Sequence, residues 1–175
     1  MTTTINRKII PMGSRTRKAV LVVHIVSVGA WIGIDVMVGV LVLAGWFSDD
    51  PGIQGLAYQA LGTFAVVPML TAAVASLASG ILLGFGTRFG LLRYWWVAVK
   101  LAMNVVLCVL ILVALRPGMA DVVEYGRSLA AGAEPQLDVS TLFFPPAVSL
   151  TALTVATVLA VAKPWGRIRS ADARK

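Results

Sequence analysis

The stretch AVLVVHIVSVGAWIGIDVMVGVLVLAGWF, residues 19–47, decides the fold. It is apolar over nearly thirty residues, whereas about 20 helical residues already cross the hydrocarbon core of a bilayer. The apolar core of a cleaved signal peptide is only ~7–15 residues long, so we interpret the stretch as an uncleaved first transmembrane helix. It also carries the only histidine of the chain, His24, together with Trp31 and Asp35.

The rest of the chain has the same apolar character. Of its 175 residues, 58% are hydrophobic and 13% are charged, and the mean hydropathy is +0.87. Soluble domains are about 45–50% apolar and about 25% charged, so the composition predicts an integral membrane protein. We expect an all-α, polytopic four-helix bundle in residues 18–166, with helices over about 18–46, 55–86, 91–115 and 142–162 and a long loop at 116–141.

Charge predicts the orientation of this bundle. Twelve of the fifteen Lys and Arg residues fall in residues 1–18, 87–93 and 163–175 (five, two and five), which hydropathy places on one side. Six of the eight acids lie on the other side, at positions 49, 50, 121, 124, 134 and 138. The positive-inside rule therefore predicts N-in, C-in topology in a bacterial cytoplasmic membrane, with cytoplasmic basic tails at 1–17 and 167–175. Such tails attract anionic lipid headgroups, so the expected partner is the bilayer rather than nucleic acid.

Polar side chains form a stripe on the first helix. Spacings of seven and four place His24, Trp31 and Asp35 on one face. A carboxylate at the centre of a membrane helix costs roughly 2.5–3.5 kcal/mol, so we expect Asp35 to face protein. On the third helix, Lys100 and Asn104 are also four apart. Lys100 either snorkels to the headgroups or bonds the first helix, and Asn104 lies at the depth of Trp31 and could bond it.

Small residues predict where helices approach closely. In the second helix four of them recur at intervals of four, and the first helix has a G-x-x-x-G pair. Lipid tails are as apolar as leucine, so small faces of this kind favour helix association in membranes. The expected packing residues are Gly29, Gly33, Ala72, Ser76, Gly80 and Gly84.

The sequence holds no catalytic triad, phosphate loop or zinc motif, and its single cysteine, Cys108, excludes a disulfide within the chain. Our leading hypothesis is a non-enzymatic accessory, binding or transport-related component, working as a homo-oligomer or in a larger membrane complex, with no cofactor. The alternative is a membrane redox protein that binds haem b or copper through His24. A second ligand would then come from Met37, Met69, Met103 or the His24 of another copy.

Three motifs, HIVSVGAWIG at 24–33, RYWWVAVK at 93–100 and KPWG at 163–166, resemble a family of small integral membrane proteins of high-GC Gram-positive bacteria without an assigned activity. That resemblance covers the whole bundle and implies the same four-helix fold. The spacing of His24 and Trp31 is also similar to that in copper-resistance-D-like membrane domains and membrane protoporphyrinogen oxidases. This second resemblance implies a haem or copper ligand at His24 alone.

Overall fold

The computed structural model describes residues 12–86 and 94–162, which are almost entirely helical. The expected cytoplasmic tail at 167–175, most of the tail at 1–17 and the connection 87–93 lie outside the described residues. In chain order the elements are α1 (Ser14–Phe47), α2 (Pro51–Phe64), α3 (Val66–Gly86), α4 (Trp95–Leu110), the π-helix η1 (Ile111–Leu115), α5 (Met119–Ala130), the 3-10 helix η2 (Ser140–Phe143) and α6 (Phe144–Ala162).

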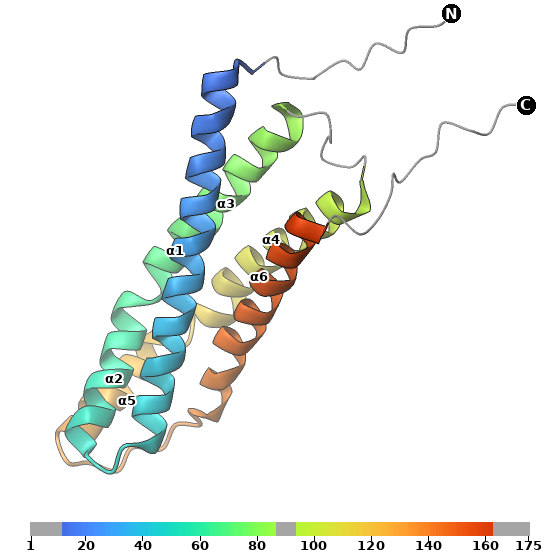
Figure 1. Ribbon diagram of the computed structural model, residues 1–175. Coiled ribbons are helices and arrows are strands. Elements are labelled where there is room, and N and C mark those ends of the chain that lie inside the picture. Colours follow the sequence, from blue (N-terminus) through green and yellow to red (C-terminus); the bar gives the residue numbers. More distant parts are fainter. Residues whose placement is uncertain (1–11, 87–93, 163–175) are drawn as a thin grey trace, which may run out of the picture.

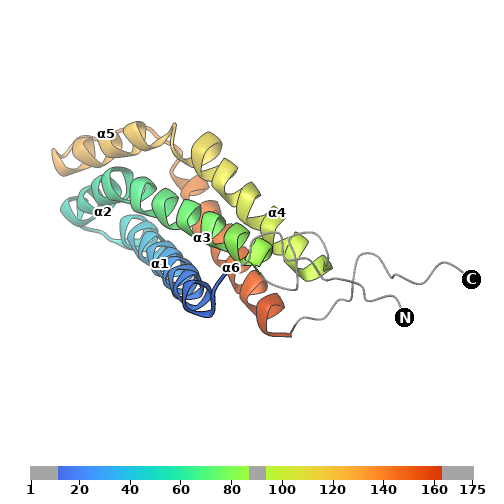
Figure 2. The ribbon, with the colours of Figure 1, turned by 90° about the horizontal axis from the view of Figure 1, so that it is seen from above.

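Four segments of the described chain are long and apolar enough to cross a membrane, which confirms the all-α fold with four spanning helices. They are Ser14–Phe47, Pro51–Gly86, Trp95–Leu115 and Ser140–Ala162. Successive segments alternate in direction, so that α1 begins and α6 ends at the same end of the bundle, here called the basic end (Figure 1). The opposite, acidic end carries the α1–α2 turn, α5 and residues 131–139. The spanning helices contact one another in the ring order α1, α3, α4, α6 (Figure 2).

The second spanning segment, which the sequence predicted as a helix over 55–86 that Pro68 kinks or tilts, is broken in two. The α-helix is interrupted at Ala65, between α2 and α3. The cause lies three residues further on, at Pro68, which has no N–H to donate to the carbonyl of Phe64. The break lets α2 follow a direction of its own toward the acidic end (Figure 1).

The acidic end extends beyond what a bilayer requires. The 34 residues of α1 make a helix about 50 Å long, against a hydrocarbon core of about 30 Å. Its last turns pack with α2, and α2 packs along its length against α5. The sequence predicted a short amphipathic helix on the outer surface in this region. The structure places α5 against α2, with the polar side chains of Asp121, Glu124 and Arg127 exposed on its other side.

Glycines allow α2 and α5 to approach at backbone distance. A Cβ placed on Gly55 would lie 2.5 Å from the carbonyl oxygen of Gly126, and one on Gly126 would lie 2.7 Å from that of Gly55. Two helical turns away, a Cβ on Gly62 would lie 2.7 Å from the carbonyl oxygen of Met119. Contacts below 3.0 Å leave no room for any side chain, so this antiparallel pairing depends on glycine at all three positions.

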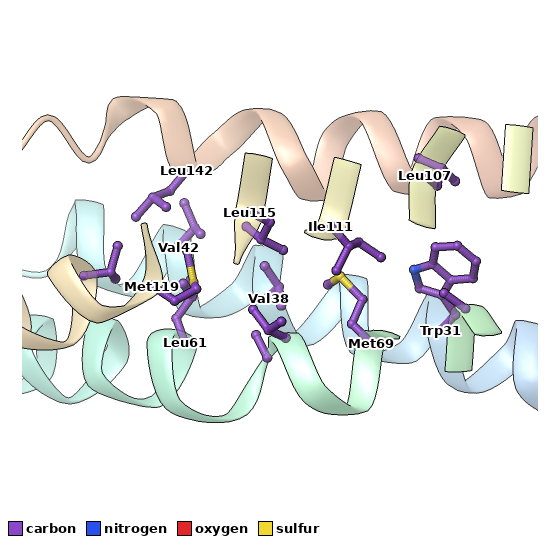
Figure 3. Packing of buried hydrophobic residues seen from close by; sticks show 14 of the residues in the cluster. Trp31, Val38, Val42, Leu61, Met69, Leu107, Ile111, Leu115, Met119 and Leu142 are labelled. Carbon is purple, nitrogen blue, oxygen red and sulfur yellow. The ribbon is translucent and has the colours of Figure 1, made fainter. Parts of the chain in front are cut away.

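The core is a column of apolar side chains along the bundle axis (Figure 3). It runs from Trp31 on α1, near Leu107 on α4, to Leu142 and Met119 at the acidic end (Figure 3). Each spanning helix contributes to this column, and Trp31 is fully buried within it. The column therefore fixes which face of each helix points inward.

Of the six expected packing residues, those on α3 lie inside the bundle and those on α1 do not. Ala72, Ser76 and Gly84 are buried, and Gly80 packs against the imidazole of His24, with its Cβ position 3.3 Å from Cε1. Gly29 and Gly33 are exposed and have no atom within 4 Å of their Cβ positions. The prediction that this pair packs helices together is wrong within the chain, because α1 turns its His24–Trp31–Asp35 face inward instead.

Candidate functional site

Asp35 lies in the bundle interior with a single hydrogen-bond partner. Its side chain is 0% exposed, and its Oδ2 accepts a hydrogen bond of 2.6 Å from the hydroxyl of Ser149 on α6. Among the described residues its Oδ1 has no partner. A carboxylate at this depth is costly unless it is well satisfied, and hydrophobic residues would stabilise the bundle more simply. Stability alone therefore does not account for a carboxyl group at this position.

Trp31 lies one turn from Asp35 on the same face of α1 and is also 0% exposed. Its indole Nε1 has no hydrogen-bond partner in the described part of the chain. The expected bond to Asn104 is therefore not formed, because the Asn104 amide donates to the hydroxyl of Ser76 at 3.0 Å. Trp31 and Asp35 thus place one unpaired donor and one unpaired acceptor in the same region of the core.

His24 anchors a second polar group, nearer the basic end, that we call the histidine network: His24, Ser76, Ser79, Asn104 and Cys108. The imidazole Nδ1 lies 3.1 Å from the carbonyl oxygen of Ser76 and 3.0 Å from the hydroxyl of Ser79. Ser79 donates its own proton to the carbonyl of Ala75 at 2.6 Å. Two acceptors therefore face Nδ1, which carries the proton, and in the neutral ring the lone pair is on Nε2. This network ties α1, α3 and α4 together.

Lys100 lies beside an aromatic ring of its own helix. Its ammonium lies 4.8 Å from the centroid of the Trp96 ring, one turn earlier on α4, and its side chain is half-buried. This cation–π geometry stabilises the charge beside an aromatic ring near the basic end. Lys100 and Asp35 form no ion pair.

The surroundings of His24 bear on the haem or copper alternative. The described residues contain no group of three His, Cys, Asp or Glu side chains close enough to hold a metal ion. Met37, one of the proposed second ligands, is exposed on the outer surface of α1, and Met69 is part of the apolar core. Within the described residues, His24 therefore has no cluster of His, Cys, Asp or Glu side chains around it that could complete a metal site.

A cavity of about 490 Å³ opens between α4 and α6 in the half of the bundle toward the acidic end. Ligand sites are typically ~300–1,000 Å³ and mostly apolar with a few polar groups, and this cavity has that character. Its inner wall includes Met69, Leu107 and Ser149. The remaining lining comes from the end of α4, η1, the start of α5, residues 137–142 and the first turns of α6.

The side of the cavity is open on the apolar outer surface of the bundle. Leu110 and Ala114 on one side and Phe144 and Val148 on the other line it, and all four are exposed on the bundle surface. Its inner wall includes Ser149, whose hydroxyl donates the hydrogen bond to Asp35. The cavity therefore connects the apolar outer surface of the bundle to the partner of the buried carboxylate.

A local change of helix type shapes one wall of this cavity. At η1 the backbone N–H of Arg116 donates to the carbonyl of Ile111 at 2.9 Å, a five-residue step. The wider turn re-aims the side chains of Ile111, Ala114 and Leu115, which all line the cavity. π-helical turns are rare and are found frequently at functional sites. The distortion at this position supports a binding role for the cavity.

Sequence reasoning missed Ser79 and Ser149 and assigned Ser76 only to packing. Several hydroxyls in these helices bond a carbonyl of their own helix, as those of Thr71, Thr151 and Thr157 do. A serine in a membrane helix therefore gives no sign of a longer-range partner. The one available signal was the cost of burying Asp35, which required a donor on some neighbouring helix.

These features are those expected of a multi-pass membrane protein: four helices long and apolar enough to cross a membrane, a cavity that opens on the apolar outer surface, and buried polar groups behind it. Comparison with models of protein families, with functionally characterised proteins and with solved structures found no significant match to the chain.

Proposed function

We propose that this protein is a non-enzymatic binding component of the membrane that holds the apolar chain of an amphipathic molecule in the cavity between α4 and α6. The observation that carries the proposal is the continuity between a membrane-facing cavity and a fully buried carboxylate through Ser149. The π-helical wall and the mixed lining, apolar in depth and polar at one end, support it further.

The proposed orientation follows the positive-inside rule and places the basic end in the cytoplasm. The cavity then lies in the outer half of the bilayer, where its side opening meets the acyl chains of the outer leaflet. Four helices are too few to enclose a transport pathway on their own. A membrane component of this size therefore fits an accessory role beside other proteins or in a homo-oligomer.

Cysteine labelling tests this orientation. In a Cys108→Ala background, a cysteine at position 134 is expected to react with a membrane-impermeant maleimide on intact cells. A cysteine at position 14, where α1 begins, is expected to react only after permeabilisation. Both native residues are exposed on the protein, so membrane sidedness alone decides the result. The reverse pattern would overturn the proposed orientation.

Photocrosslinking tests the binding function. The full chain is reconstituted with a phospholipid that carries a diazirine on its acyl chain, and adducts are mapped by mass spectrometry. We expect adducts to concentrate in residues 107–119 and 141–149 relative to the exposed face of α1. Ala114→Trp fills the cavity and should lower these adducts by at least about tenfold, since a pocket of this size binds by enclosing its ligand.

The matched control is Val113→Trp, on the neighbouring position of η1. Val113 is 70% exposed and does not line the cavity. This variant adds the same indole to the same helix and should leave the adduct pattern unchanged. Equal adduct yields in the wild type and the Ala114→Trp protein would show that the cavity holds no lipid chain, and would end the proposal.

A further inference from the structure

The end of the cavity nearest the acidic end of the bundle carries negative charge. Asp121 of α5 and Asp138 both line the cavity and are both exposed. No Lys or Arg lines it among the described residues. The acidic end as a whole has six acids against two bases, Arg116 and Arg127. An approaching headgroup therefore meets two carboxylates and a negative field.

Local structure keeps one of these carboxylates charged and in place. Oδ1 of Asp138 accepts a hydrogen bond of 3.0 Å from the backbone N–H of Ser140 and a second bond from the Ser140 hydroxyl. Both bonds favour the ionised form and hold the pKa of Asp138 below its usual range. The same turn starts η2, which leads directly into α6, so the position of Asp138 is tied to the cavity wall.

We infer that the ligand of this cavity is an aminolipid, a membrane lipid whose headgroup ends in a primary ammonium. One acyl chain lies between α4 and α6, and the ammonium is held between the carboxylates of Asp121 and Asp138. The inference rests on the proposed function, because it names the class of ligand for the same cavity.

The end of the cavity lined by Asp121 and Asp138, here called its mouth, favours an ammonium over other headgroups. An ionised carboxylate only accepts hydrogen bonds, and a primary ammonium offers three N–H donors together with a positive charge. A choline headgroup has the charge without the donors, and a glycerol headgroup leaves the lipid with a net negative charge that the two carboxylates repel. The expected order of binding is therefore ethanolamine, then choline, then glycerol headgroups.

The lipid phosphate also needs a counter-charge, and the chain supplies a candidate. Arg116 directly follows Leu115, which lines the cavity, and its side chain is exposed. The other arginine of this end, Arg127, is engaged with Glu124 at 3.5 Å. A guanidinium suits a phosphate through bidentate hydrogen bonds. The lining thus offers two acids for an ammonium, and a base that directly follows the lining in sequence is available for the phosphate.

The test uses the full chain in nanodiscs that contain equal amounts of two diazirine-labelled lipids with identical chains, phosphatidylethanolamine and phosphatidylglycerol. We expect about tenfold more ethanolamine than glycerol adducts in residues 107–119 and 141–149, a ratio typical of charge-assisted hydrogen bonds. In the double variant Asp121→Asn/Asp138→Asn this ratio should fall to within about twofold. Asn keeps a side-chain oxygen that can cap the turn at Ser140, so the local structure is retained.

Three further measurements complete the design. Glu124→Gln removes a carboxylate from the same helix, and because Glu124 does not line the cavity the preference should persist. N-acetylated phosphatidylethanolamine, which has lost its ammonium, should bind no better than phosphatidylglycerol. In the unaltered protein, raising ionic strength from about 0.05 to 0.5 M should weaken the ethanolamine preference, since the mouth is exposed to solvent.

The outcomes separate this inference from the proposed function. Equal adducts from both lipids that are lost together in Ala114→Trp would keep the cavity as a lipid site and reject the aminolipid. A preference for ethanolamine that survives in the double Asn variant would also reject it. Adducts that do not respond to Ala114→Trp would reject the proposed function itself.

Discussion

Gly126→Leu is expected to separate α5 from α2 and to lower the free energy of unfolding by about 3 kcal/mol, at the upper end of what overpacking costs. The Cβ of the new side chain would lie 2.7 Å from the carbonyl oxygen of Gly55 and 2.9 Å from the backbone nitrogen of Gln59. Both are backbone atoms of α2, so no side chain can rotate away to make room. The leucine raises the intrinsic helix propensity of α5 by roughly 0.8–1 kcal/mol, which works against the expected loss.

The measurement is equilibrium unfolding in bicelles, followed by the accessibility of a reporter cysteine on α5. Gly33→Leu is the matched control: it introduces the same side chain into α1, where the space around the Cβ position is open. That variant should retain wild-type stability in the isolated chain. If Gly126→Leu unfolded at the same denaturant concentration as Gly33→Leu, the tight α2–α5 pairing described above would be incorrect.

These two glycines also show where sequence reasoning reaches its limit. Hydropathy predicts the four spanning helices well, because hydrocarbon requires every backbone group to be satisfied within a helix. Glycine spacing did not predict packing equally well. The G-x-x-x-G pair at 29 and 33 faces outward, and the backbone contacts that need glycine occur at Gly55, Gly62 and Gly126. Which face of a helix meets a neighbour depends on the rotation of the whole helix, and a small residue has the same signature on either face.

The sequence predicted which residues of the candidate site are buried, but it did not predict their hydrogen-bond partners or the cavity beside them. The period of α1 and the cost of an intramembrane carboxylate placed Trp31 and Asp35 inside the bundle, and both are fully buried. The partner of Asp35, 114 residues away on α6, depends on the ring order of the helices. The cavity depends on the π-helical turn η1, and nothing in the sequence of that turn, ILVAL, predicts a π-helix. Both arise from tertiary packing.

Ser149→Ala is expected to destabilise the protein by about 3 kcal/mol, because it leaves a buried carboxyl group without any hydrogen bond. The hydroxyl of Ser149 is the sole described partner of Asp35, whose side chain is 0% exposed. Thr157→Ala is the matched control on the same helix. Its hydroxyl bonds the carbonyl of Leu153 within α6 at 2.8 Å, so its removal leaves no buried group unpaired, and a change below about 0.5 kcal/mol is expected.

A double-mutant cycle with Asp35→Leu isolates the cause of that loss. Leucine at position 35 removes the need for a donor, so the single variant should insert normally and be at least as stable as the wild type. In this background Ser149→Ala should cost little, which corresponds to a coupling energy of about 2–3 kcal/mol between the two positions. Additive effects would mean that Ser149 acts through packing alone. Lipid adducts in the cavity are then measured on the same Asp35→Leu protein. If the bundle is stable but the adducts are lost, the carboxylate of Asp35 takes part in lipid binding. If the bundle is stable and the adducts remain, the cavity walls bind the lipid without the carboxylate.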